Sequence, residues 1–219
     1  LSSEGSKSEA ELPGNGPADT PDSNPVEGGG VYTAPSLDGP FRPFDDGLPE
    51  RTRKETVSVQ SMALHDNAVW IVTATAGVWR APLGSGQWER AHRGLPTAES
   101  PHSGTPIHKL TRLDGHLYAL SGAAVYRRRS DSWKRFTSNA FSKEVGVDGP
   151  KFGLQNLVRH QWRLVAVTRK GLYVLDETTG AHRLFWKPNE TLILTARGLS
   201  SGLYVGTRNR GVRRHGRTP

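Results

Sequence analysis

A repeat of 47 residues limits the fold of this chain more than any other feature. Dipeptides made of an apolar residue and, in most copies, an aromatic one return at regular intervals. Four copies are spaced by 47 residues and a weaker fifth copy comes 40 residues later: Val31-Tyr32, Val78-Trp79, Val125-Tyr126, Leu172-Tyr173 and Val212-Arg213. The tripeptide Gly47-Leu48-Pro49 also returns after 47 residues, as Gly94-Leu95-Pro96. Spacing of this kind indicates that the chain is built from copies of one supersecondary unit.

Each unit contains four short strand candidates. Ahead of each dipeptide except the first, Val31-Tyr32, lies an apolar run that ends in Thr or Ser, and only a few small or basic residues separate the two, which is the spacing of a β-hairpin. These runs are 68–73, 116–121, 163–168 and 202–207. A further strand candidate precedes each run, at 58–64, 106–113, 153–159 and 191–197. An aromatic-bearing stretch comes after each of the first four dipeptides, at 40–44, 87–92, 132–136 and 182–186. No window has sustained helical periodicity.

This unit predicts an all-β fold, a β-propeller of four-stranded antiparallel blades, with about four blades or as a fragment of a larger propeller. Residues 30–49 supply only a third and a fourth strand, whereas residues 191–214 supply a first, a second and a third. Joining the two ends predicts a ring that both termini close, which would remove the exposed sheet edges. The blade formed from both ends would then contain two third strands. The alternative is that the chain is a piece of a larger propeller.

Residues 1–29 differ in composition from the rest of the chain. They carry six acidic residues, one basic residue and almost no large apolar side chains, so they cannot bury enough surface to offset the entropy of ordering. We therefore predict a disordered acidic leader over 1–29 and propeller repeats over 30–219. The repeats hold 28 basic and 15 acidic residues. Such an excess could attract nucleic acid, anionic lipid or acidic glycans, but a solvated arginine-rich surface is the simpler explanation.

The stretch 117–136, LYALSGAAVYRRRSDSWKRF, and the Gly-Leu-Pro tripeptides resemble the blades of sialidase-type Asp-box (BNR-like) propellers. They are equally similar to the propeller repeats in the extracytoplasmic sensor regions of two-component regulators. The Asp box reads Ser-x-Asp-x-Gly-x-Thr-Trp, and its best copy here is SLDGPF at 36–41; the copy at 130–133 lacks the glycine, and the copy at 84–88 lacks the acid. In that family the box builds the turn between the third and fourth strands and carries no catalysis. The resemblance therefore implies a fold and leaves the activity open.

No set of residues in the sequence points to catalysis. The chain has no cysteine, and its eight histidines form no HExxH motif. Most acidic residues fall in turns, where they stabilise the turn itself, so no carboxylate pair for hydrolysis stands out. Sialidase-type catalysis, by the resemblance, would need an arginine cluster and a tyrosine paired with a glutamate, but core packing explains the tyrosines: Tyr32, Tyr118, Tyr126, Tyr173 and Tyr204. We predict no catalytic residue, no cofactor and no metal.

One face of the predicted propeller collects the loops between second and third strands and those between consecutive blades, because neighbouring strands run in opposite directions. We predict that basic residues on this loop-rich face bind the partner: Arg51, Arg53, Lys54, Arg169, Lys170, Arg208 and Arg210. The opposite face is basic as well, so charge alone does not select a face. The prediction is a non-catalytic interaction module for a protein or acidic glycan partner.

Three alternatives stay open at this point. The chain could be a fragment of a sialidase-like or other glycan-acting enzyme, or the extracytoplasmic sensor propeller of a signalling protein. Nucleic-acid binding is the weakest hypothesis. No apolar run reaches the roughly 18 residues of a membrane span. The polar leader and the start at Leu1 fit a processed, exported chain, so we expect a secreted, periplasmic or extracellular location. The sequence does not specify the oligomeric state.

Overall fold

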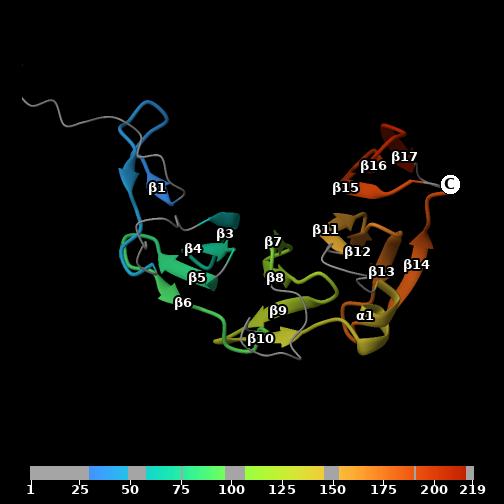
Figure 1. The fold of residues 1–219 in the computed structure, drawn as a ribbon, viewed down its shortest axis with the longest axis horizontal. Coiled ribbons are helices and arrows are strands. Elements are labelled where there is room, and N and C mark those ends of the chain that lie inside the picture. The colour runs from blue at the N-terminus through green and yellow to red at the C-terminus, as the bar shows by residue number, and fades with distance from the viewer. Residues whose placement is uncertain are drawn as a thin grey trace, which may run out of the picture.

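The computed structural model describes residues 30–48, 58–74, 76–96, 107–145, 153–189 and 191–215. The predicted leader, 1–29, lies outside these ranges. Within them the chain forms short strands and one helix, and almost all strands pair with their neighbours in sequence. The predicted all-β fold is confirmed: antiparallel sheets succeed one another as the blades of a β-propeller (Figure 1).

Three blades are complete, with four antiparallel strands each in sequence order. Blade 1 consists of β3 (Val59–His65), β4 (Ala68–Thr73), β5 (Gly77–Pro82) and β6 (Glu89–Arg90). Blade 2 consists of β7 (Lys109–Leu113), β8 (His116–Leu120), β9 (Val125–Arg129) and β10 (Ser132–Arg135). Blade 3 consists of β11 (Leu154–His160), β12 (Arg163–Thr168), β13 (Leu172–Leu175) and β14 (His182–Trp186). The second strands 68–73 and 163–168 have the bounds that the sequence predicts.

Two smaller sheets lie at the ends of the blade series. The N-terminal sheet contains β1 (Tyr32–Thr33) and β2 (Arg42–Pro43), joined by the Asp-box-like turn, in which the Gly39 amide donates to the Ser36 carbonyl at 3.2 Å. The C-terminal sheet contains β15 (Ile193–Leu199), β16 (Gly202–Thr207) and β17 (Val212–His215).

These end sheets do not join to close a ring. They are separate sheets, and they lie at the two ends of an open arc whose inner side carries β3, β7, β11 and β15 (Figure 1). The predicted closure by both ends is therefore not the arrangement that the described residues adopt. The physical reason is that β17 already occupies the place beside β16 that a third strand needs.

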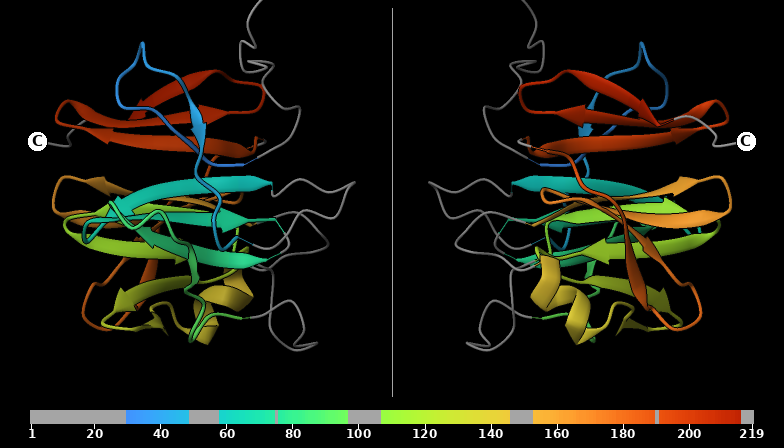
Figure 2. Two further views of the ribbon diagram at one scale, coloured as in Figure 1. Left: turned by 90° about the vertical axis from the view of Figure 1, so that its left-hand side faces the viewer. Right: turned by 90° about the vertical axis from the view of Figure 1, so that its right-hand side faces the viewer.

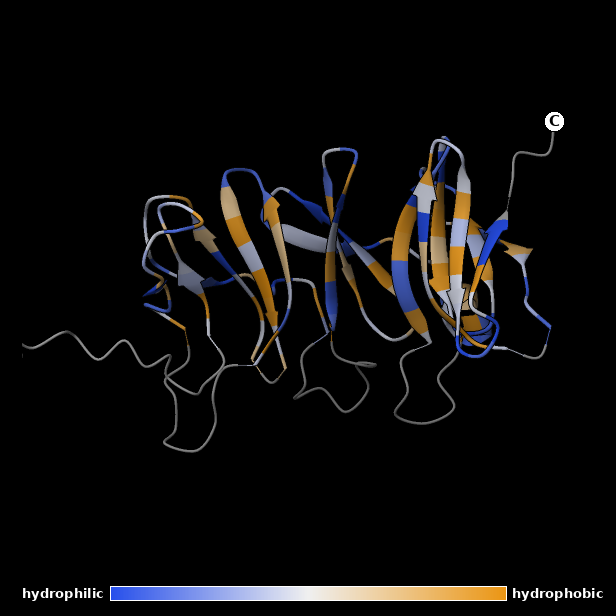
Figure 3. Ribbon diagram, turned by 90° about the horizontal axis from the view of Figure 1, so that it is seen from above, coloured by the Kyte–Doolittle hydropathy of each residue, from blue (hydrophilic) through white to orange (hydrophobic). Residues whose placement is uncertain are grey.

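Apolar cores between consecutive blades hold the arc together. Each blade presents apolar residues to the blades on either side of it (Figure 3). Between blades 1 and 2, the buried rings of Trp70 and Trp133 meet edge to face at 5.9 Å. Similar cores form between blades 2 and 3 and between blade 3 and the C-terminal sheet. The nearly continuous apolar second strands are buried for this reason, as the sequence predicts.

The Gly-Leu-Pro tripeptides connect one blade to the next. Gly94 has a φ of 90°, and a Cβ there would lie 2.2 Å from the carbonyl oxygen of Trp133 in the next blade. The Trp133 amide donates to the Arg93 carbonyl at 2.8 Å, while Leu95 is buried in the core between blades 1 and 2. The earlier copy, at Gly47, contacts the backbone of Trp88 in the same way. The repeat of this tripeptide therefore reflects a close backbone approach.

The sequence did not predict the helix α1 (Asn139–Val145), which comes after blade 2. It has only seven residues, too few for a periodic pattern to be recognised. Its Phe141 is fully buried and contacts the ring of Tyr173 in blade 3 at 5.7 Å, edge to face. Figure 2 shows α1 beside the stacked strands, near the ends of the blades. No helix in the described ranges is long and apolar enough to span a membrane.

Candidate partner-binding site

A hydroxyl side chain fixes the hairpin between the second and third strands. In blade 3, Thr168 Oγ1 donates to the Gly171 carbonyl at 2.8 Å and accepts from the Gly171 amide at 3.0 Å. Thr207 does the same in the C-terminal sheet, donating to the Gly211 carbonyl at 2.9 Å and accepting from the Arg210 amide at 3.2 Å. Thr73 and Ser121 repeat the pattern. The Thr or Ser that ends each apolar run is thus a turn-forming residue.

Backbone hydrogen bonds attach these hairpins to the segments that lead into the first strands. The Arg169 amide donates to the Gly153 carbonyl at 2.9 Å, and the Ile193 amide donates to the Arg169 carbonyl at 3.3 Å. In the C-terminal sheet the Arg208 amide donates to the Leu192 carbonyl at 3.0 Å. Hairpin tips and connections between blades therefore meet on one face, as the antiparallel alternation predicts.

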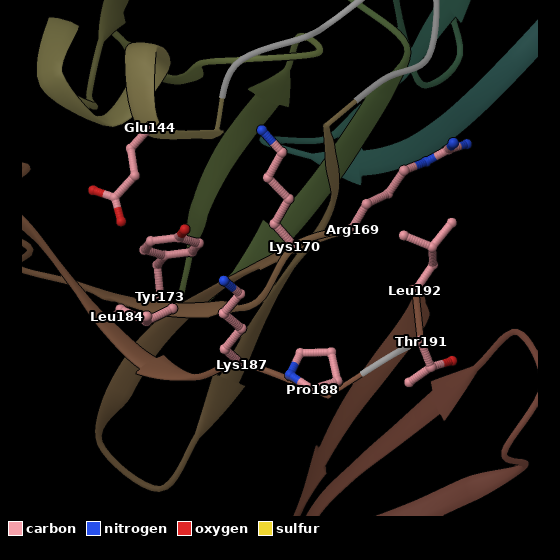
Figure 4. A pocket seen from close by; sticks show the side chains of 9 residues that line it. All are labelled: Glu144, Arg169, Lys170, Tyr173, Leu184, Lys187, Pro188, Thr191 and Leu192. Carbon is pink, nitrogen blue, oxygen red and sulfur yellow. The ribbon is translucent and has the colours of Figure 1, made fainter.

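A pocket of about 580 Å³ opens on this loop-rich face, at the junction of α1, blade 3 and the C-terminal sheet. Figure 4 shows the side chains that line it: Glu144, Arg169, Lys170, Tyr173, Leu184, Lys187, Pro188, Thr191 and Leu192. Two of them come from the blade 3 hairpin tip, and the others from α1, β13, β14 and the segment before β15. We call this cavity the loop-face pocket.

Positive charge dominates the loop-face pocket. Arg169, Lys170 and Lys187 line it, and among the described residues none of the three has a carboxylate partner. Of the lining residues that the structure describes, the one acid is Glu144, and it is already engaged, since its Oε2 lies 2.8 Å from Nε2 of His182. The remaining lining is largely apolar. A ligand that fits both parts carries negative charge next to an apolar group.

Tyr173 and Glu144 lie together at one side of the loop-face pocket. Burial of Tyr173, then the charge of Glu144 and a hydrogen bond to it, raise the pKa of the phenol to about 12. At neutral pH Tyr173 is therefore a neutral donor to the Glu144 carboxylate. A tyrosine beside a glutamate is the pair that the sialidase resemblance would need. In this structure the pair shapes one side of the pocket.

The structure brings together only some of the basic residues that the sequence selects. Arg169 and Lys170 line the loop-face pocket. Arg208 and Arg210 lie on the next hairpin and do not line it, although the neighbouring Asn209 Oδ1 accepts a hydrogen bond from Thr191 Oγ1 at 2.5 Å. The other three selected residues, Arg51, Arg53 and Lys54, lie outside the described ranges.

Sequence reasoning missed the apolar and acidic part of the pocket. In the sequence Tyr173 follows the pattern of a core residue, and it is only 4% exposed. Nothing in the sequence indicates that one edge of its ring borders a pocket. Glu144 enters through α1, which has no recognisable periodicity. Leu184 belongs to the half-exposed β14, and Leu192 precedes β15. These residues are far apart in sequence, and only the packing of blade 3 against its neighbours unites them.

A second pocket, of about 490 Å³, lies on the inner side of the arc between β7, β11 and β15. One of its two arginines, Arg159, is neutralised within the fold, because Nη1 and Nη2 donate to the two carboxylate oxygens of Glu177 at 2.5 and 3.1 Å; the other is Arg197. Hydrogen bonding to Glu177 raises the pKa of Arg159. This pocket therefore offers less unpaired charge than the loop-face pocket. Among the described residues no three His, Cys, Asp or Glu side chains are grouped for metal binding.

No protein-family model matches the chain, and no curated protein does so either. Solved structures do match. The extracellular domain of BT3049 from B. thetaiotaomicron, described as a hybrid two-component system, has a TM-score of 0.57 at 15% identity, covering 84% of this chain and 24% of that one. YCF48 bound to a D1 peptide has a TM-score of 0.53 at 16% identity, covering 78% of this chain and 54% of that one.

The computationally designed Ika4 protein has a TM-score of 0.53 at 14% identity, covering 76% of this chain and 95% of that one. The chain thus spans almost all of the designed protein, about half of YCF48 and a quarter of the BT3049 domain. At such low identities the similarity concerns the fold alone. The chain is a β-propeller by its blades, by its repeat and by these comparisons.

Proposed function

We propose that the chain is a non-catalytic interaction module that binds an acidic segment of a protein partner in the loop-face pocket. The observation that carries this proposal is the set of three cations at the border of an apolar cavity, Arg169, Lys170 and Lys187, for which the described part of the chain supplies no carboxylate partner. A folded protein gains nothing from leaving such charges together, because like charges repel. An anionic ligand would relieve that repulsion and form charge-assisted hydrogen bonds.

The shape and chemistry of the pocket favour a peptide over a purely polar ligand. Leu184, Pro188 and Leu192 give it apolar walls, while the cations border it. A leucine or phenylalanine next to aspartate or glutamate would satisfy both parts. The solved YCF48 structure contains a bound peptide, which supports a peptide-binding use of this fold. The acidic glycan that the sequence also allows is the competing ligand class.

We also propose that the module acts outside the cytoplasm, where the sensor propellers it resembles are found. The similarity to the extracellular domain of BT3049 supports this location. In that setting the same pocket would serve as the sensing site of a signalling protein. The two functions would use the same site. In a sensor, ligand binding would also trigger a signal, whereas an interaction module would only hold its partner.

The proposal is tested with a labelled pool of Asp- and Glu-rich peptides that also contain leucine or phenylalanine. Fluorescence anisotropy with the full chain measures the affinity. The variant Arg169→Glu/Lys170→Glu should bind at least about tenfold more weakly, since two attractive contacts become repulsive. The control variant Arg129→Glu/Lys134→Glu makes the same change in net charge at two exposed residues of blade 2 and should bind within about twofold of the wild type.

Three outcomes would contradict the proposal. Equal losses in both variants would mean that the probe responds to net charge and not to the pocket. Binding to sialylated or sulfated glycans but not to the peptides would mean that the ligand is an acidic glycan and not an acidic peptide. Release of sugar from such glycans, lost in Tyr173→Phe, would overturn the non-catalytic assignment and favour the glycan-acting alternative.

A further inference from the structure

The first strand of each blade presents one apolar residue to the preceding blade. This residue is Leu110 in blade 2, Leu157 in blade 3 and Ala196 in the C-terminal sheet, and its exposed fraction is 3%, 1% and 3%. Each pairs with the second-strand residue that lies two positions before the turn-forming Thr or Ser. By the same register the equivalent residue in blade 1 is Met62, which pairs with Ile71.

Met62 is not buried. Its exposed fraction is 57%, and that of Leu64, two residues along the same face, is 53%. The N-terminal sheet covers the outer part of this face, since Val31 and Leu48 pack with Ile71 and other residues of blade 1. Because the described residues of this sheet form no first or second strand, none of them covers the inner part of the face. Blade 1 thus lacks the inner half of a preceding blade.

At the other end of the arc, the C-terminal sheet exposes an apolar residue whose equivalents in the blades are buried. In blades 1, 2 and 3 the first residue of the repeat dipeptide is fully buried against the next blade: Val78, Val125 and Leu172. The equivalent residue of the C-terminal sheet, Val212, is 72% exposed. Up to residue 215, where the description ends, this sheet has first and second strands, β15 and β16, and a third, β17, but no fourth. One end therefore offers the inner half of a blade, and the other end needs it.

The repeat register shows how the two ends would fit. In blade 1, Val78 pairs with Val72 and Trp79 with Ile71. In the C-terminal sheet, Val212 pairs with Gly206 and Arg213 with Val205. Val31 and Tyr32 hold the same repeat positions as these dipeptides. Strand β1 would therefore pair with residues 205–206 of β16 in the place of β17, and β2 would come next as the fourth strand.

We propose that two copies of this chain assemble head to tail into a closed ring. In each of two composite blades, β15 and β16 of one copy are completed by β1 and β2 of the other, and β17 is displaced. The exchange replaces one antiparallel pairing with another, and it buries Met62, Leu64 and the half-exposed Tyr32. A head-to-tail contact that repeats by a two-fold rotation closes on itself and leaves no open end.

A second copy fits better than the chain's own opposite end. The apolar cores between the blades fix their mutual orientation, and they hold the N-terminal and C-terminal sheets at opposite ends of the arc (Figures 1 and 3). Bringing these ends together within one chain would require all the interfaces between blades to change. A second arc facing the open side requires only the exchange of one strand. This interface is separate from the loop-face pocket and does not depend on the proposed function.

Light scattering on the full chain at tens of micromolar tests the assembly. We expect a dimer for the wild type and a monomer for Met62→Asp, with dissociation at least about tenfold more favourable because a charge would be buried. Since Met62 is more than half exposed in one copy, the variant should keep its circular dichroism spectrum. The control is Trp162→Asp, which changes an exposed apolar residue on the β11–β12 hairpin, away from both ends, and should stay dimeric.

Introduced cysteines test the strand exchange, because the chain has none of its own. Tyr204 pairs with Arg214, the repeat equivalent of Thr33, so Tyr204→Cys in one copy and Thr33→Cys in the other should lie at disulfide distance. Mixing the two single variants under mild oxidation should give a covalent dimer. A disulfide within the monomeric double variant would instead show a four-bladed ring of one chain and overturn the proposal. A monomeric wild type, together with single cysteine variants that form no mixed disulfide, would also overturn the proposal, and the end faces would then be available to other blades.

Discussion

At the scale of single residues, the glycine of the Gly-Leu-Pro tripeptide allows two blades to approach closely. Gly94→Ala should destabilise the protein by about 3 kcal/mol, because the new Cβ would meet the Trp133 carbonyl at 2.2 Å and the residue would keep an unfavourable φ of 90°. Urea unfolding measures the change. The loss should appear as a lower midpoint for the whole transition, since the contact joins blades 1 and 2.

Gly84 is a matched control for this prediction. Its φ is 88°, almost the same as that of Gly94, but a Cβ there would meet nothing within 4 Å. Gly84→Ala should therefore show only the backbone strain, about 1 kcal/mol. The difference between the two variants isolates the contact with Trp133. If both alanines destabilised the protein equally, the close approach would contribute nothing and the tripeptide would need another explanation.

At the scale of elements, the turn-forming hydroxyl positions the hairpin that carries Arg169 and Lys170. Thr168→Val keeps the shape of the side chain but leaves the Gly171 amide without its acceptor, so the free energy of unfolding should fall by about 2 kcal/mol. Hydrogen exchange at the Gly171 amide should accelerate by about tenfold or more. Thr168→Ser keeps the hydroxyl, and its Gly171 amide should exchange at nearly the wild-type rate. Equal acceleration in the two variants would refute the role of the hydroxyl.

The sequence allows the blades to be predicted because each strand carries its own periodic signal. The runs 68–73, 163–168 and 202–207 coincide with β4, β12 and β16, since residues buried on both faces must be apolar along their whole length. Ring closure could not be predicted in the same way. Both β1 and β17 carry a third-strand signal, and the choice between them beside β16 depends on how the ends of the arc lie in space.

The candidate site is predictable only in part, for a related reason. The position of Arg169 and Lys170 can be predicted from hairpin spacing, because a basic pair between two strand signals must lie at a tip. The pocket behind them depends on α1 and on the packing of Tyr173, neither of which has a distinct sequence signal. Local patterns thus predict which charges are presented. They do not predict which apolar surface lies next to those charges.

At the scale of the whole molecule, two surfaces of different chemistry lie on different parts of the arc. The loop-face pocket is cationic and would attract its ligand by charge, whereas the ends of the arc expose apolar side chains, Met62 and Leu64 at one end and Val212 at the other, and would associate by burial. Between about 0.1 M and 1 M salt the Debye length falls from about 10 Å to about 3 Å, which weakens exposed charge pairs but not apolar contacts. Salt should therefore separate the two interactions.

We expect the affinity for the acidic peptide probe to fall at least about tenfold over this range of salt, with the dimer fraction unchanged or higher. The variants should separate in the same way. Arg169→Glu/Lys170→Glu should lose the probe and remain dimeric, and Met62→Asp should be monomeric and still bind the probe, because the loop-face pocket is formed within one chain. Anisotropy and light scattering on the same samples measure both properties. Loss of probe binding in Met62→Asp would mean that the two surfaces are coupled, and the pocket would then need the second copy to be complete.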